Sequence, residues 1–401
     1  ITLVSLTLVA CGGGGGGSSA NNPPTPAEVA AITPAQIATY SAAQIAALDV
    51  NIQYLTNPTL GAMLNTQVNA ITATEIGVLS PAQVRLIGST GAGGATTTSK
   101  VTSLNPGAWA ALVGNPTQVA AITPAETATM SIAEITALGT NIQHLSNAAL
   151  GAFIAGVTFN QVGSISAAQI AVLSPAQVRF IGSTGAGGVT TTSKINWLNP
   201  GAWAQLVSDP LQVAAITAAE AANLSITAIP AIGTNIQFLS NAALGEFVTG
   251  VTFNQIGSIS AVQIAVMSPA QVRFIGSTGA GGATTTSKIA GLNAGAWAQL
   301  VSDPLQVAAI TAAEITTLNP GQITAMGTNI KFLSNAALGA LKQAVQTILN
   351  QIAAITAAQV AVLSPAQVRF IGSTGAGGVT TTSQIAGLNS GAWAQLVSDP
   401  L

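Results

Sequence analysis

The sequence predicts an all-α fold in which short, capped helices stack in tandem, as in an α-solenoid. A segment that runs from Ser-Pro-Ala-Gln-Val-Arg to Gly-Ala-Trp occurs four times in the 401 residues, with its arginines 94, 94 and 96 residues apart. Each long repeat also contains a shorter motif of eight residues, and these short motifs open with helix-capping residues. Units with such a period bury their apolar faces on one another, so we expect an array rather than one enzyme core.

The chain opens with an apolar run, residues 1–10, that ends at Cys11, the only cysteine. We interpret this run as a truncated signal peptide, because neither a Met nor a basic segment precedes it. Residues 11–26 then read as a lipidated cysteine followed by a flexible linker rich in Gly, Ser and Pro. No later run approaches the roughly 20 apolar residues that a membrane-spanning helix requires.

The residues Leu8-Val9-Ala10-Cys11 resemble the lipobox of bacterial lipoproteins. The resemblance implies that Cys11 carries a diacylglycerol and an amide-linked acyl chain, which together anchor a protein stably in a membrane. Gly12 follows, where the family's sorting rule uses Asp to retain a protein at the inner membrane of Gram-negative cells. In such a host the resemblance implies the outer membrane or the cell surface. The alternative is a chance cysteine after an apolar run.

The eight-residue motif that starts at Ile32 carries the signals of a helix start. Thr33 is the predicted N-cap, Pro34 occupies the first helical position, and Gln36 can complete a capping box. Ile32 and Ile37 are spaced to form a hydrophobic staple. A strand is disfavoured because the two apolar positions of the motif would lie on opposite faces. The same signals, with Ser, Asn or Asp as the cap, recur at residues 145–150, 173–178, 198–203 and 209–213.

Helices of about seven residues are unstable alone, since isolated helices need roughly 12 to 15 residues. Their apolar residues must therefore pack on neighbouring helices. Motifs of this Leu-Thr-x-x-Gln-Ile kind resemble repeats of large secreted or surface proteins of bacteria, a resemblance that implies no particular chemistry. We place the repeats at residues 27–114, 115–207, 208–301 and 302–397, with the start of a further repeat at 398–401, and we expect Gly- and Thr-rich connectors that could be extended.

The composition disfavours several functions. Charged residues make up 5% of the chain, hydrophobic residues 49%, and the net charge is −2. This leaves no basic stripe for nucleic acid. One cysteine and one histidine, His144, give no metal cluster, and we expect no cofactor. His144 holds a position that is aromatic in the other repeats (Tyr54, Phe238 and Phe332), which favours packing over catalysis.

The acidic residues also favour a structural role. Glu126, Glu134, Glu220 and Glu314 fall at the third helical position, where other motifs have Gln, and this interchange argues against acid–base catalysis. No pair of carboxylates of the glycosidase kind recurs among the repeats. We therefore predict a protein without enzymatic activity.

The glycine-rich loop 182–188 is similar to a phosphate-binding loop only in composition, because Gly188 stands where a P-loop requires Lys. Gln384 also replaces the lysine of the other repeats (Lys100, Lys194 and Lys288). We expect a glycine at a helix C-terminus and then a connector, in which residues 189–192 could be extended.

Arginine and tryptophan recur in every repeat and are the candidate ligand contacts. We expect the arginines first at helix C-termini, where a cation complements the dipole, and second as a row of guanidinium groups for an anionic polymer such as a surface polysaccharide. We expect the tryptophans first as staple residues and second as platforms for sugars. These residues are Arg85, Arg179, Arg273, Arg369, Trp109, Trp203, Trp297 and Trp393.

These observations predict a membrane-anchored repeat lipoprotein with a structural, adhesive or interaction role at the bacterial cell envelope. Its expected partners are the membrane, through the lipid anchor, and a surface glycan or an envelope protein. The alternative is a carbohydrate-binding or glycan-processing surface lipoprotein that uses the Trp and Arg rows.

Overall fold

The computed structural model describes residues 23–90, 98–158, 160–184, 192–248, 254–278, 286–342, 350–374 and 382–398. These residues form short α-helices and 3-10 helices. Among them there is no β-strand, only isolated β-bridge residues such as Thr90. The predicted all-α array of short helices is therefore confirmed. Cys11 and the connector residues 189–191 lie outside the described residues.

The chain divides into two compact units, residues 1–202 and 203–401, with the boundary inside α15 (Pro200–Ser208). The α-helices of the first unit are α1 (Pro26–Ala30), α2 (Pro34–Ile37), α3 (Ala42–Ala46), α4 (Asn57–Gly61), α5 (Asn65–Ala70), α6 (Ala73–Val78), α7 (Pro81–Val84), α8 (Pro106–Val113), α9 (Pro116–Val119), α10 (Pro124–Thr129), α11 (Ile132–Ala137), α12 (Asn147–Gly151), α13 (Ala167–Val172) and α14 (Pro175–Val178). Its 3-10 helices are η1 (Asp49–Tyr54), η2 (Val101–Ser103), η3 (Gly139–His144), η4 (Val162–Ser164) and η5 (Ile195–Trp197).

The second unit is built from the same kinds of element. Its α-helices are α16 (Pro210–Ala214), α17 (Ala218–Ala221), α18 (Ala228–Ala231), α19 (Asn241–Gly245), α20 (Ala261–Val266), α21 (Pro269–Val272), α22 (Ala294–Ser302), α23 (Pro304–Ala308), α24 (Ala312–Ile315), α25 (Pro320–Ala325), α26 (Asn335–Gly339), α27 (Ala357–Val360), α28 (Pro365–Val368) and α29 (Ser390–Ser398). Its 3-10 helices are η6 (Gly233–Phe238), η7 (Ile256–Ser258), η8 (Ile289–Gly291), η9 (Gly327–Phe332) and η10 (Ile385–Gly387).

Helix caps begin these elements where the sequence predicts them. Thr33 caps α2 with a full capping box to Gln36, and Pro34 is the first helical residue. Many helices are shorter than the expected seven residues, and α2 has four, whereas α8 has eight and α22 has nine. The reason is the next cap: Ser41 already begins α3, so an eight-residue motif leaves little room for a helix.

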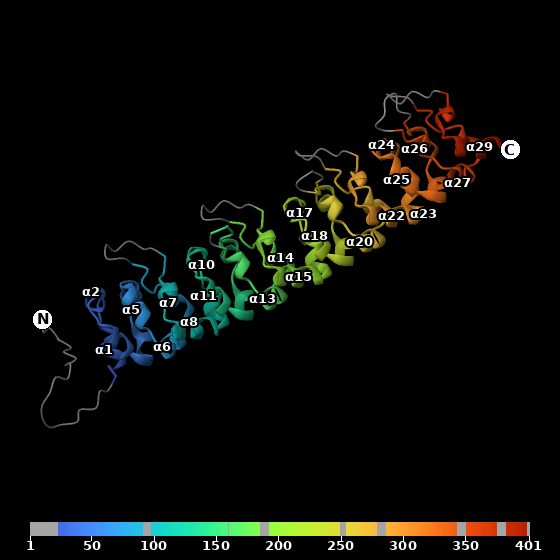
Figure 1. Ribbon diagram of the computed structural model, residues 1–401. Helices are drawn as coiled ribbons and strands as arrows, with labels where there is room; N and C mark the ends of the chain where they lie inside the picture. The colour runs from blue at the N-terminus through green and yellow to red at the C-terminus, as the bar shows by residue number, and fades with distance from the viewer. Residues whose placement is uncertain are drawn as a thin grey trace, which may run out of the picture. The chain divides into compact units, whose positions relative to one another are not determined.

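Within each unit the helices follow one another in chain order (Figure 1), and most of them pack on the third element further along the chain, counting the 3-10 helices. Examples are α6 on α8, α10 on α12 and α20 on α22. Side-chain hydrogen bonds span a similar distance along the sequence: Gln67 donates to a carbonyl 30 residues earlier and Asn105 to one 36 residues earlier. One turn of the array therefore spans slightly more than 30 residues.

The core is a stripe of isoleucine, leucine and valine from the capped motifs. Ile37, Ile45, Ile135 and Ile323 are all fully buried. Among the described residues, no helix has the length and apolar character needed to cross a bilayer.

Candidate interaction surface

The tryptophans of the first three repeats lie in the core. Trp109, Trp203 and Trp297 are 3%, 6% and 3% exposed. Their indole Nε1 atoms donate to the carbonyls of Glu134, Ala228 and Gln322, at 3.2, 3.0 and 3.1 Å. In this packing the three rings offer no free face for a sugar. Trp393 differs, with 42% of its surface exposed.

Glutamine at the third helical position serves two bonds at once. Gln169 accepts the Ser166 N–H through Oε1 at 2.9 Å and donates through Nε2 to the Ile135 carbonyl at 2.8 Å. One side chain thus caps its own helix and holds a neighbouring turn. Asn105 works similarly: it caps α8 and donates to the carbonyl of Ile71. These repeated polar residues are therefore used to hold the array together.

The four arginines lie at helix ends, as their positions in the sequence predict. Each is the C-cap residue of a four-residue helix (α7, α14, α21 or α28), and each is exposed. Within the described parts of the chain, their guanidinium groups make no hydrogen bond or ion pair. They are therefore available to bind an anion.

An apolar residue follows each arginine and is also partly exposed. The resulting Arg–Phe surface consists of the pairs Arg85–Leu86, Arg179–Phe180, Arg273–Phe274 and Arg369–Phe370. The phenylalanines were not predicted as ligand contacts. Their recurrence after the arginine was visible, but nothing in the motif showed that the phenylalanine is exposed while the tryptophan is buried.

Further positive charge lies beside this surface. The Lys100, Lys194 and Lys288 amides donate to the carbonyls of Ile87, Ile181 and Ile275, each two residues after an arginine of the Arg–Phe surface. The four arginines and these three lysines are seven of the nine cations in the chain. Glu126 and Glu314 are buried, so they contribute little opposing charge at the surface.

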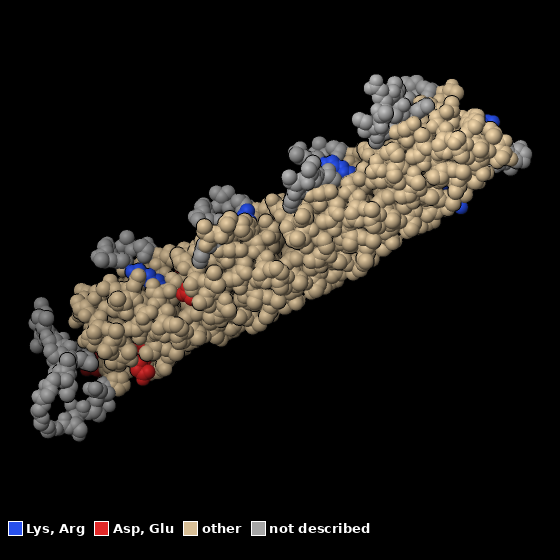
Figure 2. Space-filling model, viewed as in Figure 1, with Lys and Arg blue, Asp and Glu red and all other residues tan. Residues whose placement is uncertain are grey.

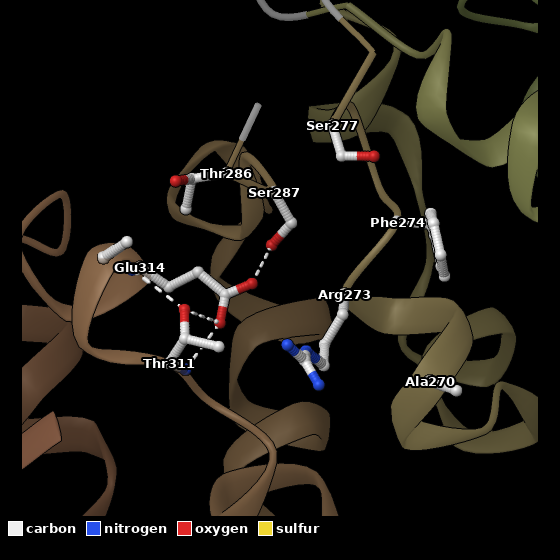
Figure 3. A pocket seen from close by; sticks show the side chains of 9 residues that line it. Ala270, Arg273, Phe274, Ser277, Thr286, Ser287, Thr311 and Glu314 are labelled. Carbon is white, nitrogen blue, oxygen red and sulfur yellow. Dashed lines mark hydrogen bonds between the residues drawn. The ribbon is translucent and has the colours of Figure 1, made fainter. Parts of the chain in front are cut away.

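One pair of this surface borders a pocket of about 700 Å³ in the second unit. Figure 3 shows Arg273 and Phe274 on one side of the pocket and Thr311 and Glu314 on the other. The Glu314 carboxylate is occupied: Oε2 accepts from the Thr311 N–H and hydroxyl at 2.7 and 2.9 Å, and Oε1 accepts from the Ser287 hydroxyl. Arg273 is therefore the charged group that remains open to a ligand.

The remaining candidates show no catalytic arrangement among the described residues. Within those residues no cluster of His, Cys, Asp and Glu could hold a metal. His144 is half-buried at the end of η3. Glu126, Glu134, Glu220 and Glu314 occupy the third helical position and complete capping boxes.

The glycine predicted at a helix end, Gly182, has a φ of +64° three residues after Arg179. This is the left-handed conformation that glycine adopts readily. Most of the connector that follows it, residues 185–191, lies outside the described residues.

Charged side chains are sparse on the face of the molecule in Figure 2.

The comparisons with known proteins add no relative: no family model, curated protein or solved structure matches this sequence.

Proposed function

We propose that this chain is a non-enzymatic repeat lipoprotein with a structural, adhesive or interaction role at the bacterial cell envelope. Cys11 is the proposed site of lipidation and the membrane anchor, with the outer membrane or the cell surface as the location. The repeats are the proposed binding part of the molecule.

The observation that carries this proposal is the repeated Arg–Phe surface. The tryptophans of the first three repeats and the recurrent Gln and Asn side chains are bonded inside the array, whereas the arginines are exposed and unbonded among the described residues. Several weak contacts on one chain raise the overall affinity for a repetitive partner, because binding at one site raises the effective concentration at the next. The surface therefore suits a polymer or a dense envelope layer.

An acidic glycan is a second, narrower candidate. The pocket beside Arg273 and Phe274 combines a guanidinium group, which binds carboxylates in a bidentate manner, with an aromatic ring on which an apolar sugar face can lie. The buried Trp109, Trp203 and Trp297 are replaced in this role by the phenylalanines.

Lipidation is tested in bacteria that carry the full-length gene. We expect labelled palmitate to be incorporated into the protein and the protein to be recovered with membranes. Cys11→Ser removes the thiol, so both label and membrane association should be lost. Label that persists in Cys11→Ser, or an unlabelled parent protein, would refute the anchor.

Glycan binding is tested with a uronate-containing polysaccharide and a neutral one of similar size. Replacing all four arginines of the Arg–Phe surface by Gln should abolish binding to the acidic polymer. The matched control replaces Lys331 and Lys342, which lie outside that surface, and should bind almost as well as the parent. Equal binding by the four-arginine variant would remove the glycan candidate and leave the scaffold role to be tested against envelope proteins.

A further inference from the structure

A second row of aromatic side chains lies on the surface, at the last residue of each long 3-10 helix. Tyr54, Phe238 and Phe332 are 45%, 42% and 38% exposed. Their counterpart in the second repeat, His144, is half-buried. The sequence suggested a packing role for this position, but more than a third of each of the three exposed side chains is open to solvent.

One hydrogen bond joins this row to the Arg–Phe surface in every repeat. In the third repeat Gln271 Nε2 donates to the carbonyl of Gln237, the residue before Phe238, at 2.6 Å. The Phe274 N–H in turn donates to the Gln271 carbonyl at 2.9 Å. Phe238 and Phe274 therefore flank the same side-chain hydrogen bond, on two adjacent turns of the array. The corresponding bonds of the other repeats run from Gln83 to Gln53, from Gln177 to Gln143 and from Gln367 to Lys331.

The pocket beside Arg273 extends this region in the opposite direction along the array. Thr311 and Glu314, on the far side of the pocket in Figure 3, belong to the turn after Arg273, whereas Phe238 belongs to the turn before it. The site therefore runs over three consecutive turns of the second unit. Because neighbouring helices lie about 8 to 10 Å apart, these three turns span roughly 16 to 20 Å. A site of this length is longer than one sugar ring and suits a chain of sugars.

We propose that Phe238 is a second contact for an acidic glycan, so that one uronate chain runs along the array from Phe238, over Arg273 and Phe274, into the pocket. Arg273 binds a carboxylate of the chain, and the two rings lie under apolar sugar faces. This inference rests on the acidic glycan named under the proposed function and adds that the ligand is a chain rather than a single sugar acid. Tyr54 and Arg85 form the corresponding pair in the first unit.

The fourth repeat offers a comparison within the second unit. Lys331 Nζ lies 5.2 Å from the centroid of the Phe332 ring, a cation–π contact that covers one face of this ring. Phe370 follows Arg369 as Phe274 follows Arg273. We therefore expect a sugar chain to contact Phe370, but to contact Phe332 less than Phe238.

The test uses the full chain labelled with 4-fluorophenylalanine, whose fluorine resonances are assigned with single Phe→Leu variants. The probes are galacturonate and a galacturonate oligosaccharide longer than about 20 Å when extended. We expect the oligosaccharide to shift the resonances of Phe238 and Phe274 with one dissociation constant, and the Phe332 resonance less. The monosaccharide should shift Phe274 alone. A neutral oligosaccharide of the same length should shift neither at these concentrations.

Phe238→Ala should weaken binding of the oligosaccharide roughly three- to eightfold, the effect of covering the 42% of this side chain that is exposed. Binding of the monosaccharide should not change. Ile226→Ala is the matched control, because Ile226 is 43% exposed and lies on neither η6 nor α21. It should leave both affinities unchanged.

The outcomes separate this inference from the proposed function. A Phe238 resonance that stays in place while Phe274 responds would overturn the inference and leave the acidic glycan as a candidate. Equal losses of affinity in Phe238→Ala and Ile226→Ala would also overturn it. If neither resonance responded to the oligosaccharide, the acidic glycan and this inference would both be wrong.

Discussion

At the scale of single residues, one substitution breaks the bonding rule of the array. Gln169, Gln263 and Gln359 donate through Nε2 to the carbonyls of Ile135, Ile229 and Ile323. The first repeat has Glu75 at this position, fully buried. Its Oε2 accepts the Thr72 N–H at 2.6 Å, but its Oε1 has no hydrogen-bond partner. A carboxylate cannot donate, so the bond that the amide makes elsewhere is missing.

Glu75→Gln should therefore stabilise the first repeat. Burial raises the pKa of Glu75 above its usual 4.5, and the nearby Asp49 carboxylate raises it further, against the hydrogen bonds from Thr72. A raised pKa means that the contribution of Glu75 to stability is fully present below pH 4.5 and is lost as pH rises through the shifted value. We expect the Gln variant to gain about 1 kcal/mol near neutral pH from the restored bond. Urea unfolding as a function of pH measures both effects.

The reverse exchange is the matched control. Gln169→Glu places a carboxyl group against the Ile135 carbonyl, so this variant should lose stability at neutral pH and recover it in acid. A Glu75→Gln variant with the same pH dependence as the parent, or a Gln169→Glu variant insensitive to pH, would contradict this account.

Glycine at a helix end is also required by a close contact. A Cβ on Gly151 would lie 2.4 Å from Thr184 Oγ1 and 3.3 Å from Thr184 Cβ. The Thr184 N–H donates to the Gly151 carbonyl at 2.9 Å, so the two backbones cannot separate without losing this bond.

We expect Gly151→Ala to cost about 1 to 3 kcal/mol, as overpacking generally does. Gly77 in α6 is the control, because a Cβ there meets nothing within 4 Å. Gly77→Ala should gain roughly 0.5 to 1 kcal/mol through helix propensity. Adding Thr184→Ala to Gly151→Ala removes the nearer clashing atom and should restore part of the loss. Thermal unfolding of the three variants would show this order, and equal effects of the two single glycine substitutions would exclude the contact as the cause.

At the scale of elements, the sequence predicted where helices begin better than where they end. A cap such as Ser174 and its partner Gln177 lie three residues apart, so local chemistry alone specifies the start. The 3-10 helices were not predicted. The longer ones, η1, η3, η6 and η9, begin at residues with positive φ: Asp49, Gly139, Gly233 and Gly327. Each follows a helix that the motif does not terminate.

The sequence could not predict which carbonyls accept the side-chain amide groups, and the reason is different. Which carbonyl receives Gln169 Nε2 depends on the helix packed 34 residues away, and that distance follows from the number of elements in one turn. The same holds for exposure: Trp203 and Phe180 are both aromatic residues of short helical segments, and only the turn packed above Trp203 buries it. Local patterns therefore predict the helices, and tertiary packing decides the binding surface.

The cap of α21 should matter although the helix has only four residues. Ser268 Oγ accepts the Gln271 N–H, and Gln271 Oε1 accepts the Ser268 N–H. Ser268→Ala removes the first bond and should cost about 1 kcal/mol. Faster hydrogen exchange in α21 and a lower urea midpoint would report the loss.

Ser302→Ala is the comparison for this prediction. Ser302 is exposed in α22, and its hydroxyl donates to the Gln299 carbonyl instead of capping a helix. Its removal should change stability by less than about 0.5 kcal/mol, as surface substitutions usually do. If both serine variants behaved alike, capping would not be what holds α21.

At the scale of the whole molecule, stability rests on apolar burial and neutral hydrogen bonds. The chain has nine basic and eleven acidic residues. Four of the acids, Glu75, Glu126, Glu220 and Glu314, are buried at the third helical position and are used as caps. No ion pair links the side chains that the structure describes. Screening of charges by salt should therefore have little effect on the stability of the fold.

We therefore expect the urea midpoint to be nearly the same at about 0.05 and about 0.5 M sodium chloride, although the Debye length shortens about threefold over that range. Sodium sulfate at equal ionic strength is the control, and it should raise the midpoint because it strengthens apolar burial. Binding to an acidic polymer should instead weaken as sodium chloride is added, since the exposed arginines act through charge and the salt screens them. A midpoint that falls with sodium chloride, in parallel with binding, would mean that the arginines hold the fold together, and the Arg–Phe surface would then no longer be free for a partner.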